Sequence, residues 1–246
     1  MEQKKNLESG MELLENPEAL QETLSKTEEF AKKNQNLILG VIGGLLLVVG
    51  IGFWYDWYLQ ENNTEAQQEL FPAVFFLEKD SVAKALAGDG GNTTIGLNGI
   101  ADEYASSKAG KLANLYIGIA KMQEASRAAD AAAKNKKFDE AIAALENFNP
   151  DDYLVQARVY CLIGDAYSEK NELAKAIDFY KKASEHYPNE FFTPTYLIKL
   201  GLAYETQKNW KDAAQAYQKI VKEYKASEDF AKAEKLLAKA QKLGGK

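Results

Sequence analysis

The chain has 246 residues, of which 46% are hydrophobic and 27% are charged, a balance typical of folded globular proteins rather than disordered ones. Its formal net charge of -6 provides no basic surface for a phosphate backbone, so we expect no nucleic-acid binding. A single cysteine, Cys161, cannot form an internal disulfide, and a single histidine, His186, cannot build a His/Cys metal cluster with it.

Residues 1–36 read as a polar tail with one short helix. Asn16 can cap this helix, Pro17 suits its first position, and Leu20, Leu24, Thr27 and Ala31 follow at helical intervals. We expect the helix to run into the segment that follows. Its role stays open between a solvated helix beside a membrane and a docking element.

Residues 37–58 are predicted to form a transmembrane helix that ends in an aromatic belt. Leu37 to Tyr55 carry no charge, and nineteen helical residues rise roughly 29 Å, about the ~30 Å thickness of the hydrocarbon core of a bilayer. The aromatic belt consists of Trp54, Tyr55, Trp57 and Tyr58, because amphipathic rings favour the interface between the hydrocarbon core and water. Because 36 mostly polar residues precede the apolar run, a cleaved signal peptide is disfavoured and the chain is expected to stay anchored in the lipid bilayer.

Basic residues near this helix predict its orientation. Lys26, Lys32 and Lys33 precede it, whereas acidic residues follow it, so the N-terminus should be cytoplasmic and the larger part periplasmic. Gly40 and Gly44 form a G-x-x-x-G pair, which favours a contact with another membrane helix. Glycine is frequent in membrane helices, so a pair without a contact is the alternative.

Residues 59–99 are predicted to be a linker. Leu59 to Leu77 should be helical, with a kink or a restart at Pro72, and Gly88 to Asn98 should be a loop because Gly, Asn and Thr dominate it. The helical domain is then expected to occupy residues 100–246.

One helical pair in this domain carries a complete repeat signature, which consists of Tyr160, Ile163, Gly164, Tyr167, Ala176, Tyr180, Ala183 and Pro188. This spacing resembles the tetratricopeptide repeat family over residues 157–190. The small residues allow two antiparallel helices to approach closely, and the aromatic residues fill the space between successive pairs. The resemblance therefore implies a helical solenoid that binds proteins.

Two further units support an array. The second lies 37 residues later and contains Leu197, Leu200, Gly201, Tyr204, Ala213, Tyr217 and Ile220. A degenerate first unit contains Ile117, Gly118, Ala141, Leu145 and Phe148, with 11 additional residues between its glycine and its alanine. Eleven residues make about three helical turns, so the insertion predicts one long helix from about Ala109 to Ala133. Glu228 to Leu243 should form an amphipathic C-terminal capping helix.

The concave groove of such an array is the expected binding surface. Its predicted lining consists of Leu112, Leu115, Ile119, Arg158, Asp165, Glu169, Thr195, Ile198, Leu202 and Glu205. Cys161 and Asp165 stand where the family's clamp for a C-terminal carboxylate has lysine and asparagine, so that ligand is disfavoured. An extended or helical protein segment with apolar or basic side chains is expected instead. The alternative is that part of this lining packs against neighbouring helices.

No catalytic residue, cofactor or metal ligand is expected, and the chain is predicted not to be an enzyme. His186 falls near the end of a helix, Cys161 sits where a small packed side chain is ordinary, and the glycines at Gly88 to Gly91 lack the lysine of a phosphate-binding loop.

The whole plan is all-α: one transmembrane helix, then a tetratricopeptide solenoid with a capping helix. With Ser106 to Ala113 opening the array, it resembles YfgM-type proteins of Gram-negative inner membranes. That resemblance implies an ancillary subunit of the Sec translocon whose partners are SecYEG and a PpiD-like membrane-anchored chaperone. A scaffold in another envelope complex, such as outer-membrane assembly, gliding or a different secretion system, is the alternative.

Overall fold

The computed structural model describes residues 17–90, 94–148 and 152–245, and within these ranges all regular structure is helical. The chain forms two compact units, residues 1–58 and residues 59–246. The fold is therefore all-α, as predicted.

The polar tail contains the expected helix, α2, which spans Pro17–Lys33. Asn16, its predicted cap, lies outside the described residues. The helix does not run unbroken into the next one, because Asn34 interrupts it and α3 begins at Gln35. The side-chain amide of Asn34 donates to the carbonyl of Phe30 (2.9 Å), which its own backbone N–H also contacts (3.0 Å). The Ile38 N–H also donates to the Asn34 carbonyl (2.9 Å), so backbone hydrogen bonds of helical spacing continue on both sides of Asn34 and the interruption is local.

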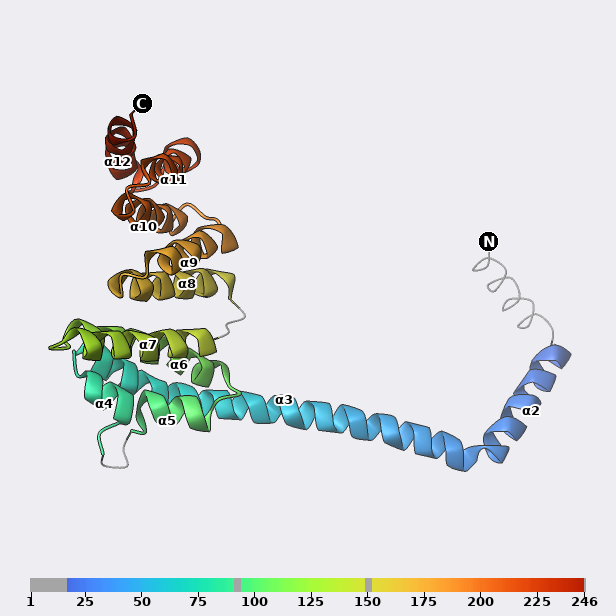
Figure 1. The fold of residues 1–246 in the computed structure, drawn as a ribbon. Coiled ribbons are helices and arrows are strands. Elements are labelled where there is room, and N and C mark those ends of the chain that lie inside the picture. Colours follow the sequence, from blue (N-terminus) through green and yellow to red (C-terminus); the bar gives the residue numbers. More distant parts are fainter. Residues whose placement is uncertain (1–16, 91–93, 149–151, 246) are drawn as a thin grey trace. The chain divides into compact units, whose positions relative to one another are not determined.

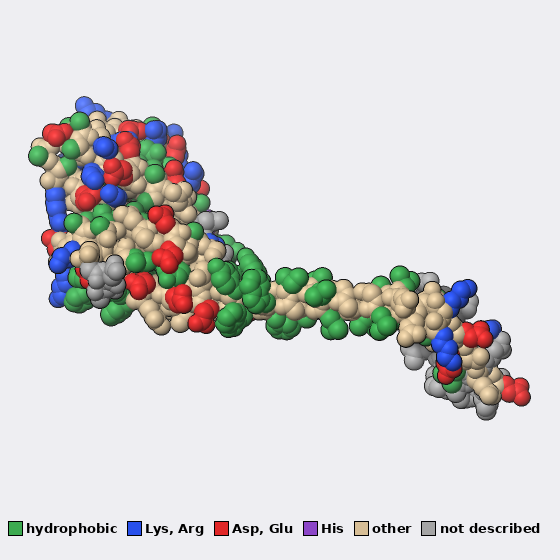
Figure 2. All heavy atoms as spheres, turned by 90° about the horizontal axis from the view of Figure 1, so that it is seen from below, with side chains coloured by type: hydrophobic (Ala, Val, Ile, Leu, Met, Phe, Trp, Pro, Cys, Tyr) green, Lys and Arg blue, Asp and Glu red, His purple; other side chains and the backbone are tan. Residues whose placement is uncertain are grey.

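Helix α3 spans Gln35–Glu78 and includes the predicted membrane segment. Its most apolar window is long enough to cross a membrane, and none of that window is buried against the rest of the protein. Leu46 and Val48, for example, are 67% and 69% exposed. Figure 2 shows hydrophobic side chains along this stretch and no acidic or basic ones. An unburied apolar helix of this length is costly in water but favourable in lipid.

The part of α3 beyond residue 58 differs from the expected linker. The helix continues through Pro72 without a restart and ends at Glu78. Its buried residues Ala66, Leu70, Ala73 and Leu77 share one core with α4 (Val82–Ala87), α5 (Gly96–Glu103) and α6 (Lys108–Ser126). The Asn63 side chain also accepts a hydrogen bond from the Ala109 N–H (2.9 Å) at the start of α6. Residues 59–99 thus belong to the folded unit.

The loop predicted from Gly88 to Asn98 is shorter in the structure, because α5 already begins at Gly96. Gly88 has a φ of 82°, and a Cβ at this position would lie 2.1 Å from the carbonyl oxygen of Thr94. Only glycine fits this close approach of backbone to backbone.

Helical pairs follow each other in chain order through the rest of the unit (Figure 1). They are α6 with α7 (Ala131–Asn147), α8 (Tyr153–Glu169) with α9 (Leu173–His186), and α10 (Thr193–Thr206) with α11 (Trp210–Glu223). The predicted close approach is present in all three pairs. A Cβ added at Gly118, Gly164 or Gly201 would lie within 2.3–2.7 Å of the facing Leu145, Tyr180 or Tyr217 side chain.

The prediction of one long helix from Ala109 to Ala133 is wrong. Helix α6 ends at Ser126, and Asp130 caps α7 by accepting a hydrogen bond from the Ala133 N–H (2.8 Å). The α6–α7 pair has 11 more residues between its glycine and its alanine than the α8–α9 pair has. Three of them extend the end of α6, seven extend the start of α7, and one lengthens the turn. The cap and an ion pair between Arg127 and Asp80 hold this turn in place.

The expected capping helix is present as α12, which spans Phe230–Leu243. It buries Ala233 and Ala240 against the core that α8 to α11 form, and its lysines are exposed. The helix therefore closes one end of the array with a solvated face.

Candidate protein-binding groove

The predicted groove residues fall into three groups by exposure. The exposed ones are Arg158, Glu169, Thr195 and Leu202, the half-buried ones are Leu112, Ile119, Asp165 and Glu205, and the buried ones are Leu115 and Ile198. Leu115 is 6% exposed and Ile198 is 2% exposed, and both belong to core clusters. These two side chains pack inside the protein, as the alternative reading of the lining allowed, and offer no surface to a partner.

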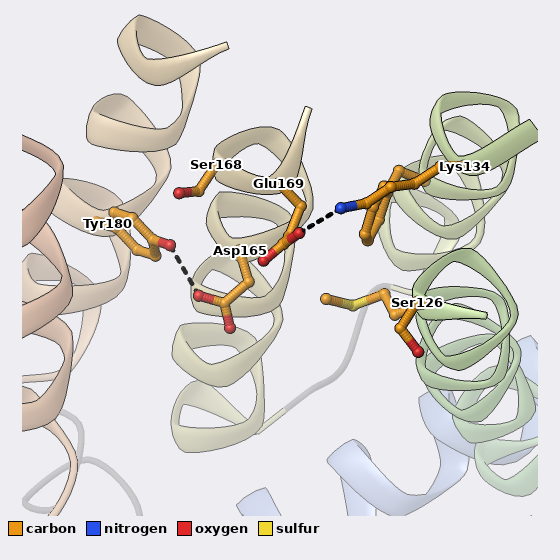
Figure 3. A pocket seen from close by; sticks show the side chains of 8 residues that line it. Ser126, Lys134, Asp165, Ser168, Glu169 and Tyr180 are labelled. Carbon is orange, nitrogen blue, oxygen red and sulfur yellow. Dashed lines mark hydrogen bonds and ion pairs between the residues drawn. The ribbon is translucent and has the colours of Figure 1, made fainter. Parts of the chain in front are cut away.

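A cavity of about 480 Å³ lies between the α6–α7 pair and the α8–α9 pair (Figure 3). It contains Asp165 and Glu169 of the predicted lining, together with Met122, Ser126, Lys134, Phe138, Ser168 and Tyr180. Glu169 accepts a hydrogen bond from Lys134 (2.8 Å), which reaches across from α7. One wall is therefore acidic, and a lysine of the facing pair partly neutralises it.

Asp165 is held from two sides. It accepts hydrogen bonds from the Tyr180 hydroxyl (2.8 Å) and from the Lys199 ammonium (2.7 and 2.5 Å). Burial, followed by the charge of Asp165, raises the pKa of Tyr180. For Lys199, burial acts to lower the pKa, but Cys161 and Asp165 outweigh it and the pKa is raised. Asp165 is thus an anchored anion that joins α8, α9 and α10.

We call such a carboxylate, which accepts hydrogen bonds from both a tyrosine and a lysine, a tie. A second tie lies in the next helical pair. Glu205 accepts hydrogen bonds from the Tyr217 hydroxyl (3.3 Å) and from Lys239 of α12 (2.5 Å). Lys199 and Asp165 are 34 residues apart, and so are Lys239 and Glu205. Each tie joins a first helix, its own second helix and the helix that follows.

Cys161 and His186 occupy ordinary structural positions. Cys161 is buried, and burial together with Asp165 raises its pKa to about 12, so the thiol stays protonated near neutral pH. His186 is exposed at the end of α9, with its ring 5.4 Å from that of Tyr160.

Profiles of the tetratricopeptide repeat family match residues 157–190 and 196–227. These two helical pairs are tetratricopeptide repeats. The matches cover α8 with α9 and α10 with α11, while the α6–α7 pair lies outside both matched ranges. No curated protein matches the chain. Tetratricopeptide repeats bind protein segments along their surfaces, so this part of the chain is a protein-interaction scaffold.

Gly40 and Gly44, the predicted contact in the membrane helix, lie on the exposed surface of α3. A Cβ at either position would meet nothing within 4 Å. The space beside them is open, and a contact with another helix remains a proposal.

Sequence reasoning missed Lys134 and Tyr180, which line the cavity, and Lys199, which binds Asp165. Lys134 follows directly after the long helix predicted from Ala109 to Ala133, whereas in the structure it lies in the first turn of α7. Tyr180 was assigned only to packing. Lys199 could have been found by stepping one 34-residue repeat forward from Asp165, since that step reaches the helix that stacks next to it.

Proposed function

We propose that the chain is a membrane-anchored scaffold whose repeats hold a protein segment on the periplasmic side of the inner membrane, as an ancillary subunit of the Sec translocon. The observation that carries the proposal is one chain with both an unburied apolar helix long enough to cross a membrane and two tetratricopeptide repeats, with a cavity of about 480 Å³ beside the first of them. The resemblance to YfgM-type proteins favours SecYEG and a PpiD-like chaperone as partners.

The charges that flank α3 support the orientation. Lys26, Lys32 and Lys33 precede the apolar segment, and Asp56 and Glu61 follow it. In spheroplasts, added protease should digest the part beyond Tyr58 and leave the tail intact. Digestion of that part only after lysis would reject a periplasmic location.

The groove favours an extended or helical segment rather than a free carboxylate. Its exposed members, Arg158, Glu169, Thr195 and Leu202, offer one positive, one negative, one polar and one apolar contact. Asp165, Glu169 and Glu205 are already held by lysines of this chain, and Thr195 donates a hydrogen bond to Asp229 (2.7 Å). A partner would therefore gain specificity at Arg158 and Leu202 without displacing an internal contact.

Photo-crosslinking in intact cells tests the membrane helix and the groove as binding surfaces. A crosslinking residue at Gly40 should capture a subunit of the membrane channel, and one at Leu202 should capture a chaperone or an exported chain. Lys235, which is exposed on α12, provides a matched control site. Capture of a different envelope complex from Gly40 and Leu202, without any Sec component, would reject the Sec assignment and favour the alternative. Equal capture from Leu202 and Lys235 would reject the groove.

A further inference from the structure

Four exposed aromatic side chains form what we call the aromatic ridge: Tyr153, Tyr187, Phe191 and Phe192. Their exposed fractions are 64%, 48%, 86% and 49%. Tyr153 at the start of α8 stacks on Tyr187 at the end of α9, with ring centroids 6.1 Å apart and planes inclined by 9°. The two phenylalanines follow in the turn that leads into α10. Hydrogen bonds of Asn189 link the backbone of Tyr187 to that of both phenylalanines. Exposed apolar side chains grouped in this way mark interaction surfaces.

Hydrogen bonds of Asn189 order the turn that contains the two phenylalanines. The Asn189 side chain accepts hydrogen bonds from the Phe191 N–H (3.1 Å) and the Phe192 N–H (2.8 Å), and donates to the Tyr187 carbonyl (2.9 Å). The Asn189 N–H donates to the hydroxyl of Thr193 (2.8 Å), which is fully buried. Because the backbone is fixed at both ends, the exposure of Phe191 is a property of an ordered turn.

The carboxylates next to the ridge in the sequence are those of Asp152, Glu185 and Glu190, which are exposed, and residues 152–157 and 183–195 contain no lysine or arginine. Asp152 also caps α8 by accepting hydrogen bonds from the Leu154 and Val155 N–H groups, and the exposed His186 lies against Tyr153 with ring centroids 5.9 Å apart. Rings elsewhere in the unit lie under lysines of the same chain: Lys182 is 4.5 Å from the centre of Phe179 and Lys175 is 4.9 Å from that of Tyr167. Among the described residues, no lysine or arginine covers a ring of the ridge.

We propose that the aromatic ridge docks a basic, apolar segment of a partner protein. Lysine or arginine side chains of that segment lie over the uncovered rings and pair with Asp152, Glu185 and Glu190, while its apolar side chains pack between the rings. The carboxylates at the rim oppose an anionic lipid surface, which favours a protein over a membrane as the occupant. The ridge shares no residue with the predicted lining of the groove.

Fluorescence anisotropy on the full chain in nanodiscs of neutral lipid tests the proposal. The probe is a labelled peptide that repeats arginine, leucine and glycine, and its counterpart has glutamate in place of arginine. We expect the arginine peptide to bind roughly tenfold more tightly than the glutamate peptide, and the Tyr187→Ala/Phe191→Ala variant to weaken its binding roughly tenfold. Both side chains are largely exposed, so their loss should leave the fold intact.

Two further variants are compared with the ridge variant. Phe71→Ala removes a phenylalanine that is 77% exposed on α3 and should bind the arginine peptide as the wild type does, whereas Leu202→Ala shows whether the peptide sits in the groove instead. Equal binding of the two peptides would overturn the proposal. A loss caused by Leu202→Ala but not by the ridge variant would overturn it as well, because the peptide would then sit in the groove.

A membrane role for the ridge gives a different result. A fluorophore attached through Phe191→Cys should not be quenched by lipids that carry a short-range quencher, since the native Cys161 is buried and only the new thiol is labelled. Quenching in the absence of peptide would assign the ridge to the bilayer and overturn the proposal.

Discussion

At the scale of single residues, the glycines of the repeats decide how closely each helical pair packs. Gly201 faces Tyr217, which is fully buried, and a Cβ at Gly201 would lie 2.3 Å from its ring. A fully buried ring cannot move aside without disturbing its own neighbours.

Gly201→Ala should therefore lower the free energy of unfolding by about 1–2 kcal/mol, because overpacking outweighs the better helix propensity of alanine. Thermal denaturation followed by circular dichroism measures the change. Gly43→Ala in the membrane segment is the control, since a Cβ there meets nothing within 4 Å. A Gly201→Ala protein as stable as the wild type would show that the facing ring is not fixed.

Lys199 tests a tie between neighbouring repeats. Lys199→Met should cost about 1–2 kcal/mol, because it leaves the half-buried Asp165 with only the Tyr180 hydroxyl. Lys211→Met, at an exposed position, should be nearly neutral. A double-mutant cycle with Asp165→Asn should give a clear coupling energy, and additive effects would contradict the tie.

At the scale of helices, the turn between α6 and α7 is braced by four charged residues. Glu124 contacts Lys121 (3.2 Å) and Lys137 (2.8 Å), and Glu140 contacts the same two lysines at 3.0 and 3.3 Å. Burial acts to raise the pKa of Glu124 and of Glu140, but hydrogen bonds from the lysines outweigh it, so both pKa values are lowered from 4.5.

Because the pKa values of Glu124 and Glu140 are lowered in the folded state, the stabilisation from their ion pairs depends on pH. It is fully present above the unfolded value of 4.5 and is lost as pH falls through the lower folded values. Glu124→Gln should be about 1 kcal/mol less stable than the wild type at neutral pH, and the gap should close in acid. Urea denaturation across this range measures it; a gap independent of pH would contradict the charge network.

The helices and their pairing could be predicted because local signals suffice for them: Gly164, Ala176 and Tyr180 stand at repeat spacing, and Pro17 starts a helix. The break between α6 and α7 also has a local signal, the capping residue Asp130, which the sequence prediction overlooked. What the sequence could not show is the ion pair of this turn with Asp80, which lies 47 residues before Arg127. The burial of Leu115 and Ile198 could not be predicted from the sequence either, since it depends on which helices stack beside them.

At the scale of the whole molecule, the folded unit begins inside a helix. Helix α3 runs through residue 58, where the two compact units divide, and its later turns supply Ala66, Leu70, Ala73 and Leu77 to the core. The point at which the chain can be cut without loss of the fold is therefore not the point at which the helix ends.

A chain that starts at Leu59 should be soluble and should unfold cooperatively at a temperature close to that of the full protein. A chain that starts at Lys79 should lose the packing of α4 to α6, because four buried side chains are missing. Circular dichroism and gel filtration compare the two. Equal stability of both would show that the last turns of α3 are dispensable.

The ties at Asp165 and Glu205 bear on how such an array can grow. Tyr180 and Tyr217 stand at the same place in their units, and each shares a carboxylate with a lysine from the next helix along, which for Glu205 is Lys239 of α12. The last helix is thus fastened much as an internal one is. The two carboxylates differ in place, however: Asp165 stands one residue after Gly164, and Glu205 stands four residues after Gly201. In an α10–α11 unit duplicated ahead of α12, the position 34 residues after Glu205 would be a copy of Leu202, so a longer array would need a new lysine at that junction.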